Sequence, residues 1–350
     1  PFGIHVVARI FGQARLARSV AVHQIDLAVP VTVAHECDVA PVRGPVWQQV
    51  RVVVRRQLPH VGAVGRPNGG SVDVPRALLA AVETEGGVLR TSSPVDTITC
   101  SGERVSGVAL SDGTEITAPV VVSACNPHDT FLRWLRNPPA SAHDLVHRWH
   151  GVRHDEGYES KIDAVLTDAP VLRGADRPLG STTVIAPGLA EIDLAARLMP
   201  RGEILDLPGM LVNVPTLLDP TMAPQGRHVL SLEALFTPFG FVDGWSDPAE
   251  PRRWLETFAE LCEPGLLDSI VEWRAMTPDV YERDFNLPNG HATSFAGGPL
   301  AVFRNQHAEL TDYETAVDGL YLTGTATFPG AGVWGASGRN CATVVLEQRA

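Results

Sequence analysis

Residues 319–348 read GLYLTGTATFPGAGVWGASGRNCATVVLEQ, and this stretch decides how the fold is interpreted. The apolar run Leu320–Leu322 is long enough for one buried strand. A glycine-rich loop follows, and then a segment that suits a helix with Ala342, Val345 and Leu346 on one side. Glycine lets the backbone approach a ligand closely, and a helix start offers free N–H groups to an anion. The order strand, loop, helix therefore predicts a ligand site, with a plain surface turn as the alternative.

Three glycines in this stretch, Gly330, Gly332 and Gly335, fit the pattern G-x-G-x-x-G. In a dinucleotide-binding Rossmann unit, that pattern is followed by a second strand and by an acidic residue about twenty positions further on. Here Glu347 still belongs to the predicted helix, and the sequence ends at Ala350. The pattern is therefore interpreted as a second, C-terminal ligand contact of a fold whose main dinucleotide loop lies elsewhere.

The motif order resembles the C-terminal flavin motif of the phytoene dehydrogenase-like, or carotenoid desaturase-like, branch of the FAD-dependent amine oxidase superfamily. Members of that family typically read G-L-Y-L-x-G, then T-x-P-G-G-G-V, then G-x-x-G-R-N-A-A. This chain supplies Gly319–Gly324, Thr327–Val333 and Gly335–Ala342. It departs from the family at Ala331, at Phe328, where the family often has histidine, and at Cys341, and none of these changes removes a turn glycine at the helix start.

A second block, residues 68–125, is similar to the family segment with a Gly-Gly doublet, a helix, P-V-x-x-I, a D-G-T hairpin and V-V-S-x-A. The resemblance implies FAD as the cofactor. It implies that these residues bind it: Gly69, Gly70, Val95, Ala124, Gly324, Thr325, Gly332, Val333, Gly335, Ala336 and Asn340. The residues expected to face the substrate are Phe295, Phe328 and Trp334. Because the flavin itself accepts the hydride, no catalytic side chain is assigned.

Residues 285–304, which carry no charged residue between Phe285 and Arg304, are the best candidate for a substrate-facing wall, with a buried linker as the alternative. Elsewhere, the helix predicted over 72–85 is expected to bury Val74, Leu78, Leu79 and Val82. Strands are predicted over 88–90, 95–99, 105–110, 115–117, 120–124, 158–166, 182–185, 209–214 and 229–236. Helices are predicted over 192–199 and 251–262, and residues 1–60 are predicted to be helical, with one helix over 46–58.

The predicted fold class is α/β, with an α+β second lobe: a partial FAD/NAD(P)-binding, Rossmann-like domain with an inserted mixed, largely antiparallel substrate domain. Residues 68–125 and 305–350 are expected to form the discontinuous FAD-binding domain, without its first βαβ unit. Residues 126–304 would form the substrate domain, and residues 1–67 a helical segment of the substrate lobe. The apolar strands over 120–124 and 320–322 are expected to be buried side by side.

The family's N-terminal FAD loop, a strand followed by G-x-G-x-x-G and a helix, is not found in this sequence. The acidic residue that would hold the adenosine ribose is not found either. We therefore expect an N-terminally truncated sequence that binds FAD poorly when it is expressed alone, because the two phosphates lose most of their N–H donors.

Composition narrows the function further. The net charge of −12 over 350 residues argues against a nucleic-acid partner. Five cysteines without a C-x-x-C pair indicate reduced thiols and no disulfide framework, which favours a cytoplasmic protein. The arginines at 51, 55 and 56 are interpreted as a solvated face, with peripheral contact to anionic lipid as the alternative. The sequence does not indicate an oligomeric state.

Four histidines, His143, His147, His150 and His154, recur at spacings that place them on one helical face. Imidazole nitrogens suit zinc or copper. Ligands spread over roughly 16 Å of one straight helix cannot surround a single ion, however. A solvated helix face without a metal is therefore expected.

These observations favour a flavin-dependent oxidoreductase that takes a hydride from a small apolar or isoprenoid-like substrate. An amine oxidase of the same superfamily is one alternative, and an aromatic cage at the flavin would favour it, whereas a long apolar tunnel would favour a desaturase. A non-catalytic flavin-fold remnant that works as an interaction module is the other.

Overall fold

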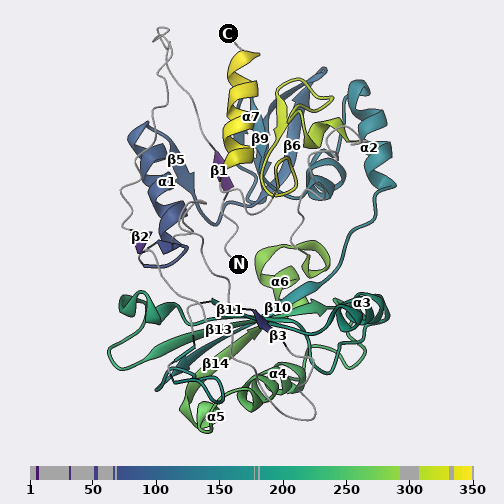
Figure 1. The fold of residues 1–350 in the computed structure, drawn as a ribbon. Coiled ribbons are helices and arrows are strands. Elements are labelled where there is room, and N and C mark those ends of the chain that lie inside the picture. The colour runs from purple at the N-terminus through teal and green to yellow at the C-terminus, as the bar shows by residue number, and fades with distance from the viewer. Residues whose placement is uncertain are drawn as a thin grey trace. The chain divides into compact units, whose positions relative to one another are not determined.

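The computed structural model describes residues 5–7, 31–32, 51–53, 66–67, 69–176, 178–179, 182–291, 307–330 and 335–348 (Figure 1). The chain divides into two compact units. Residues 1–9, 88–155 and 282–350 form unit 1, and residues 10–87 and 156–281 form unit 2. Each unit has a hydrophobic core of its own. The predicted mixed α/β class is confirmed.

Unit 1 contains a parallel strand pair that joins two distant parts of the sequence. Strand β9 (Val121–Ser123) pairs in parallel with β15 (Leu320–Leu322), with Val122 opposite Tyr321. All three residues of β15 are buried, as expected for a strand that is covered on both faces. The predicted neighbourhood of the two apolar strands is therefore confirmed, but the predicted burial of both strands is not, because Val122 of β9 is 43% exposed.

Most of the other strands of unit 1 pair with strands that are close to them in the sequence. Strands β6 (Val95–Ser101), β7 (Arg104–Leu110) and β8 (Glu115–Thr117) form an antiparallel meander. Gly113 takes a positive φ of 86° in the β7–β8 turn, as the Asp-Gly signal predicts. The other regular elements of unit 1 are β1 (His5–Val7), β5 (Val88–Arg90), α2 (His143–His150) and α7 (Ala336–Glu347).

Unit 2 is built on a six-stranded antiparallel sheet with the order β14-β10-β13-β12-β11-β3. The predicted largely antiparallel sheet is confirmed. Its strands are β3 (Arg51–Val53), β10 (Tyr158–Leu166), β11 (Thr182–Ala186), β12 (Met210–Asn213), β13 (His228–Thr237) and β14 (Ile270–Met276). The helices of this unit are α1 (Asp73–Thr84), α3 (Leu189–Leu198), α4 (Ala249–Glu260) and α5 (Leu266–Ser269), and α6 (Pro278–Phe285) is divided evenly between the two units.

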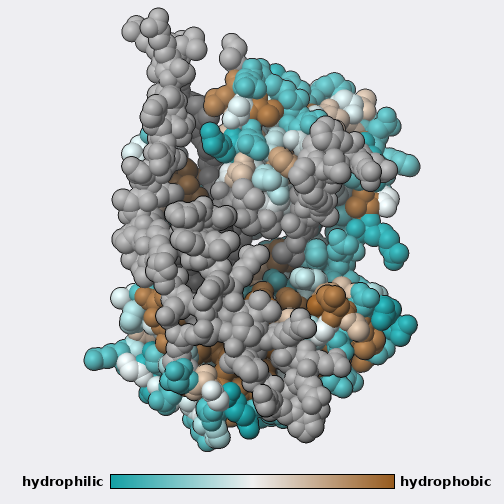
Figure 2. All heavy atoms as spheres, in the orientation of Figure 1, coloured by the Kyte–Doolittle hydropathy of each residue, from teal (hydrophilic) through white to brown (hydrophobic). Residues whose placement is uncertain are grey.

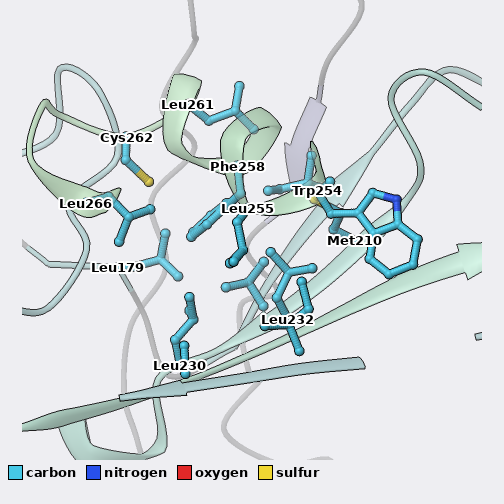
Figure 3. Packing of buried hydrophobic residues seen from close by; sticks show 14 of the residues in the cluster. Leu179, Met210, Leu230, Leu232, Trp254, Leu255, Phe258, Leu261, Cys262 and Leu266 are labelled. Carbon is cyan, nitrogen blue, oxygen red and sulfur yellow. The ribbon is translucent and has the colours of Figure 1, made fainter. Parts of the chain in front are cut away.

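The core of unit 2 lies on one face of this sheet. Residues alternate along β10, so Ile162 and Ala164 point into the core and their neighbours point to the other face. Helix α4 covers the core with Trp254 and Phe258, and Figure 3 shows these side chains gathered with Leu230 and Leu232 of β13. The two faces of the sheet therefore differ chemically.

The prediction of a helical N-terminal region is wrong where the structure describes it. His5–Val7, Val31–Thr32 and Arg51–Val53 are strands β1, β2 and β3, and Arg66–Pro67 is β4. Strand β3 adds to the edge of the large sheet beside β11. Valine is β-branched and favours strands, and tertiary pairing overrides the helical spacing. The rest of residues 1–65 lies outside the described residues.

Two predicted helices form, with a different inward face from the one expected. Helix α1 has no fully buried residue, and Leu78 is 48% exposed. In α7 the buried residues are Ser337 and Cys341, whereas Leu346 is 67% exposed. Cys341 packs with Tyr313 and Tyr321. The contacts of Cys341 with Tyr313 and with Tyr321 of β15 therefore determine which side of α7 faces inward.

The compact units also divide the chain at other positions than the predicted domains. Residues 126–155, expected in the substrate domain, cluster with unit 1, because Phe131 and Trp149 pack into the same core as Ile98 of β6. Residues 69–87 cluster with unit 2. Strand β14 and helix α6 were not predicted.

Apolar and hydrophilic residues are interspersed on the visible surface of the described residues (Figure 2), as on an ordinary globular protein. None of the helices in the described part of the chain is long and apolar enough to span a bilayer.

The predicted substrate-facing wall is described only in part. Phe285, at the start of this wall, is exposed, and residues 292–306 lie outside the described ranges.

The core on β13 is expected to dominate the stability of unit 2. Leu232→Ala removes a fully buried side chain and leaves a cavity, so it should lower the free energy of unfolding by about 2–5 kcal/mol. Leu189→Ala makes the same change at a position that is 85% exposed and should stay within about 0.5 kcal/mol of the parent protein. Denaturant unfolding followed by circular dichroism measures both. Equal losses would contradict this placement of the core.

Candidate functional site

The turn that follows β15 brings two predicted cofactor residues together. Thr323 donates its N–H to the Ser123 carbonyl at 2.8 Å, which extends the pairing with β9 by one residue. Gly324 has a φ of 89°, and a Cβ at this position would lie 3.0 Å from the Ala124 carbonyl oxygen. Glycine is required here for two reasons: the left-handed backbone and the close approach of the Ala124 carbonyl.

A buried hydroxyl without a partner lies at the start of this turn. Among the described residues, Thr323 Oγ1 is the buried side-chain oxygen or nitrogen for which no hydrogen bond is formed. Leaving a buried hydroxyl unpaired costs free energy, and such groups are uncommon in native proteins. A polar ligand group that reaches the turn would satisfy it.

The start of α7 supplies a second set of donors. Gly335 caps the helix with a φ of 74°, and the bond from the Arg339 N–H to the Gly335 carbonyl, at 2.9 Å, begins the helical ladder. The N–H groups that precede Arg339 have no partner inside the helix, as in any α-helix. The first turn of α7 carries no acidic residue. This end of the helix therefore suits an anion.

A hydrogen-bond network centred on Tyr313 ties the turn to α7. The Tyr313 hydroxyl donates to the Phe328 carbonyl at 2.6 Å and accepts from Asn340 Nδ2 at 2.9 Å. Ser337 Oγ donates to the same Phe328 carbonyl at 3.1 Å and to the Thr327 carbonyl at 3.3 Å. The structure thus brings the predicted residues Phe328 and Asn340 together through Tyr313.

Sequence reasoning did not single out Tyr313, Ser337 or Thr323. Ser337 and Thr323 lie inside the terminal motif but are not among the glycines that drew attention to it, and Tyr313 precedes the motif altogether. Burial raises the pKa of Tyr313, and the hydrogen bond from Asn340 partly offsets this rise. Burial also raises the pKa of the Cys341 thiol to about 11, so it stays protonated at neutral pH and is not a nucleophile.

Other predicted cofactor residues are placed in unit 1 as follows. Val95 begins β6 opposite Leu110 and is half-buried. Ala336 begins α7 and is half-buried, while Thr325 is exposed in the turn. Gly332, Val333, Trp334 and Phe295 lie outside the described residues.

The glycine doublet lies in unit 2. Gly69 donates its N–H to Asp219 Oδ2 at 2.6 Å. Gly70 is buried with a φ of 94°, and a Cβ there would lie 3.1 Å from Met222 Cε. Both glycines are therefore held against the segment that carries Asp219 and Met222, which the sequence did not predict.

A cavity of about 340 Å³ opens beside this contact, on the face of the large sheet opposite its core. Such a volume lies within the range of small-molecule sites. The residues that line it are Pro67, Gly70, Ser71, Lys161, Asp163, Asn213, Pro215, Leu218, Asp219, Met222, Val229 and Ser231. Gly70 is the predicted cofactor-site residue among them.

Three of the four histidines predicted on one helix face lie on α2, and the fourth, His154, follows the helix. His143, His147 and His150 are exposed on α2. His154 is exposed beyond the helix end and stacks on His128, with ring centroids 3.8 Å apart. In the part of the chain that the structure describes, no three His, Cys, Asp or Glu residues are grouped so that they could hold a metal ion.

No protein-family model matches the chain. It is 30% identical over 306 residues to mouse pyridine nucleotide-disulfide oxidoreductase domain-containing protein 2, a match that covers 82% of this chain and 52% of the mouse protein. It is also 30% identical to the neurosporene-forming phytoene desaturase of Rhodobacter capsulatus, over 76% of this chain and 50% of that protein. The chloroplastic prolycopene isomerase of Arabidopsis thaliana is 24% identical, over 78% of this chain and 44% of the isomerase.

The chain is similar in sequence to the carotenoid desaturase-like branch of the FAD-dependent oxidoreductase superfamily. The resemblance inferred from the terminal motif is thus confirmed, at modest identity. The chain spans about half the length of the curated relatives that it matches.

The Tyr313 hydroxyl is expected to hold the glycine turn in place. Tyr313→Phe leaves the Asn340 amide without its acceptor and the Phe328 carbonyl with Ser337 as its remaining side-chain donor. The stability should fall by about 1–2 kcal/mol. Hydrogen exchange at the Thr327 and Gly330 amides, which bond within the turn, should become faster.

The matched control is Tyr158→Phe, because this tyrosine belongs to unit 2 and its side chain is not part of the turn. The control should leave exchange at residues 323–330 unchanged. Equal exchange in the Tyr313→Phe variant and the parent protein would show that the network does not order the turn.

Proposed function

We propose that the chain is part of a FAD-dependent oxidoreductase that takes a hydride from an apolar or isoprenoid-like substrate. The observation that carries this proposal is the β15–turn–α7 arrangement. Its unpaired Thr323 hydroxyl, its glycine turn and the donor end of α7 are grouped in one unit. The relatives named as a phytoene desaturase and as an oxidoreductase domain-containing protein support the same function.

The described residues fit an anionic, polar cofactor at this turn. The Thr323 hydroxyl would pair with a polar group of FAD, and the first N–H groups of α7 would face a negatively charged part. Arg339, exposed at the first turn of α7, adds a positive charge nearby. FAD, when bound, supplies the hydride acceptor.

The contribution of the chain's own residues is binding and orientation. The Tyr313 network fixes the distance between the turn and the start of α7, so the donors are held in place before any ligand arrives. Pre-organisation of this kind lowers the entropic cost of binding. The Cys341 thiol is neutral and buried beside Tyr313, so it takes no part in proton transfer at neutral pH.

The proposal predicts flavin reduction by isoprenoids. The natural protein that contains this chain, loaded with FAD and kept free of oxygen, should lose its oxidised-flavin absorbance when an isoprenoid compound is added, because the flavin accepts the hydride. A primary amine is the matched comparison. Bleaching by the amine alone would favour an amine oxidase, and retention of the flavin colour with both compounds would contradict the proposal.

A charge placed at the first turn of α7 should separate cofactor binding from stability. Gly338 is exposed, and among the described residues a Cβ there would meet no heavy atom within 4 Å outside the helix's own backbone. Gly338→Asp removes a helix glycine and puts a carboxylate near the positive end of α7, and both changes favour the helix. The same carboxylate should repel the cofactor phosphates and weaken FAD binding roughly tenfold.

Gly338→Asn is the control, because it has nearly the same shape without the charge. It should bind FAD within about twofold of the parent protein, since the affinity depends on charge rather than on space. Fluorescence titration with FAD and thermal melting measure the two effects. Equal FAD affinity of the Asp and Asn variants would remove the start of α7 from the cofactor site.

A further inference from the structure

The cavity of unit 2 has a polar floor formed by three neighbouring strands. Asp163 of β10 lies opposite Ser231 of β13, and Ser231 lies opposite Asn213 of β12. All three are half-buried and line the cavity, together with Lys161. Because residues alternate between the two faces of a strand, this polar row follows directly from the burial of Ile162, Val212 and Leu232 on the other face.

The charged groups on the walls already have partners. The Asp163 carboxylate forms one ion pair with Lys161 Nζ at 3.0 Å and another with the Arg274 guanidinium at 3.0 Å. Asp219 accepts from the N–H and hydroxyl of Thr221 and from the Gly69 N–H. These hydrogen bonds, chiefly those from Thr221, lower the pKa of Asp219. Asp163 is thus balanced by cations and Asp219 is held by neutral donors, so neither carboxylate needs a ligand as its partner, which favours an uncharged molecule over an ion.

The remaining walls are apolar. Leu218, Met222 and Val229 line the cavity with Pro67 and Pro215. A pure hydrocarbon would match these walls but would cover the polar floor without pairing it, which costs free energy. A molecule with an apolar body and one polar, uncharged end matches both parts.

We propose that this cavity takes the uncharged hydroxyl- or carbonyl-bearing end of an otherwise apolar molecule, with Ser231 and Asn213 as its hydrogen-bonding partners. That this molecule is the substrate rests on the proposed function, whereas its binding to the cavity does not require FAD. The inference narrows the expected substrate class from hydrocarbons to oxygenated, isoprenoid-like compounds.

The acidic residues near the cavity affect whether the polar end of the ligand is expected to be neutral or cationic. Burial raises the pKa of Glu233, and the charges of Glu159 and Asp163 raise it further, while Lys161 lowers it. Glu233 lies opposite Lys161 on the sheet and is not one of the lining residues named above. Lys161 thus offsets part of the negative charge of Glu233 as well as pairing with Asp163.

Three ten-carbon probes of nearly equal shape test the proposal on FAD-free protein: geraniol, its hydrocarbon analogue 2,6-dimethyl-2,6-octadiene, and geranylamine. Isothermal titration calorimetry should give geraniol an affinity about tenfold higher than the hydrocarbon, as one or two hydrogen bonds would produce. Asn213→Leu and Ser231→Ala should each reduce this preference, and the double variant should bring the two probes to near parity.

Ser106→Ala is the matched control, because Ser106 is a half-buried strand serine with a hydrogen bond in unit 1. It should leave the preference for geraniol unchanged. Met222→Trp would fill the cavity from its apolar side and should abolish binding of geraniol even if a floor variant fails to fold.

Three results would overturn the proposal: no binding of geraniol, tighter binding of the hydrocarbon or the amine, or geraniol binding that neither the floor variants nor Met222→Trp changes. Because the titration uses protein without FAD, its outcome is independent of flavin reduction. A protein that binds geraniol but never bleaches flavin would retain the cavity assignment and lose the proposed function.

Discussion

The parallel pairing of β9 with β15 is the interaction on which the rest of unit 1 depends. It joins Val121–Ser123 to Leu320–Leu322, nearly two hundred positions later in the sequence. The pairing puts Leu320 and Leu322 into the core with Ile98 and Val105, where burying each leucine stabilises the fold by about 1.5–3 kcal/mol. Only when these strands are paired can Thr323 bond to Ser123 and the glycine turn begin at Gly324.

The same pairing constrains the chemistry of the turn. Gly324 is pressed against the Ala124 carbonyl at the end of β9, so the chain must turn away at this point. The turn then returns to Ser337 and Asn340 in the first half of α7, and the Tyr313 hydroxyl fixes its far side. The buried Thr323 hydroxyl is left without a partner among the described residues. Strand pairing thus positions a hydroxyl that the described part of the fold does not itself use as a hydrogen-bonding group.

In unit 2 the two faces of one sheet have different roles: one face forms the core and the other lines the cavity. Its core face is apolar, with Trp254 and Phe258 of α4 packed on β13, and this face supplies the stability. The opposite face is free to carry Lys161, Asp163, Ser231 and Asn213 beside a cavity. Ion pairs and hydrogen bonds among these groups limit the cost of holding them partly away from water.

Much of the local structure could be predicted because it depends on short-range patterns in the sequence. Strand β10 (Tyr158–Leu166), strand β8 (Glu115–Thr117) and strand β15 begin and end at the predicted residues, since alternation, a turn glycine or a short apolar run marks each one. The N-terminal segments failed because an edge strand such as β3 needs a partner, β11, that lies far away in the sequence.

The sequence by itself determined the family, the mixed α/β class and the order strand, glycine turn, helix at its end, because glycine positions and apolar periods are local properties of the chain. Only the tertiary structure decided that Tyr313 links Phe328 to Asn340 and that Ser337 and Cys341 face inward on α7. It also decided that Gly70 lines a cavity with Met222. These contacts join residues without any common pattern, and they exist because packing brings distant side chains within reach of one another.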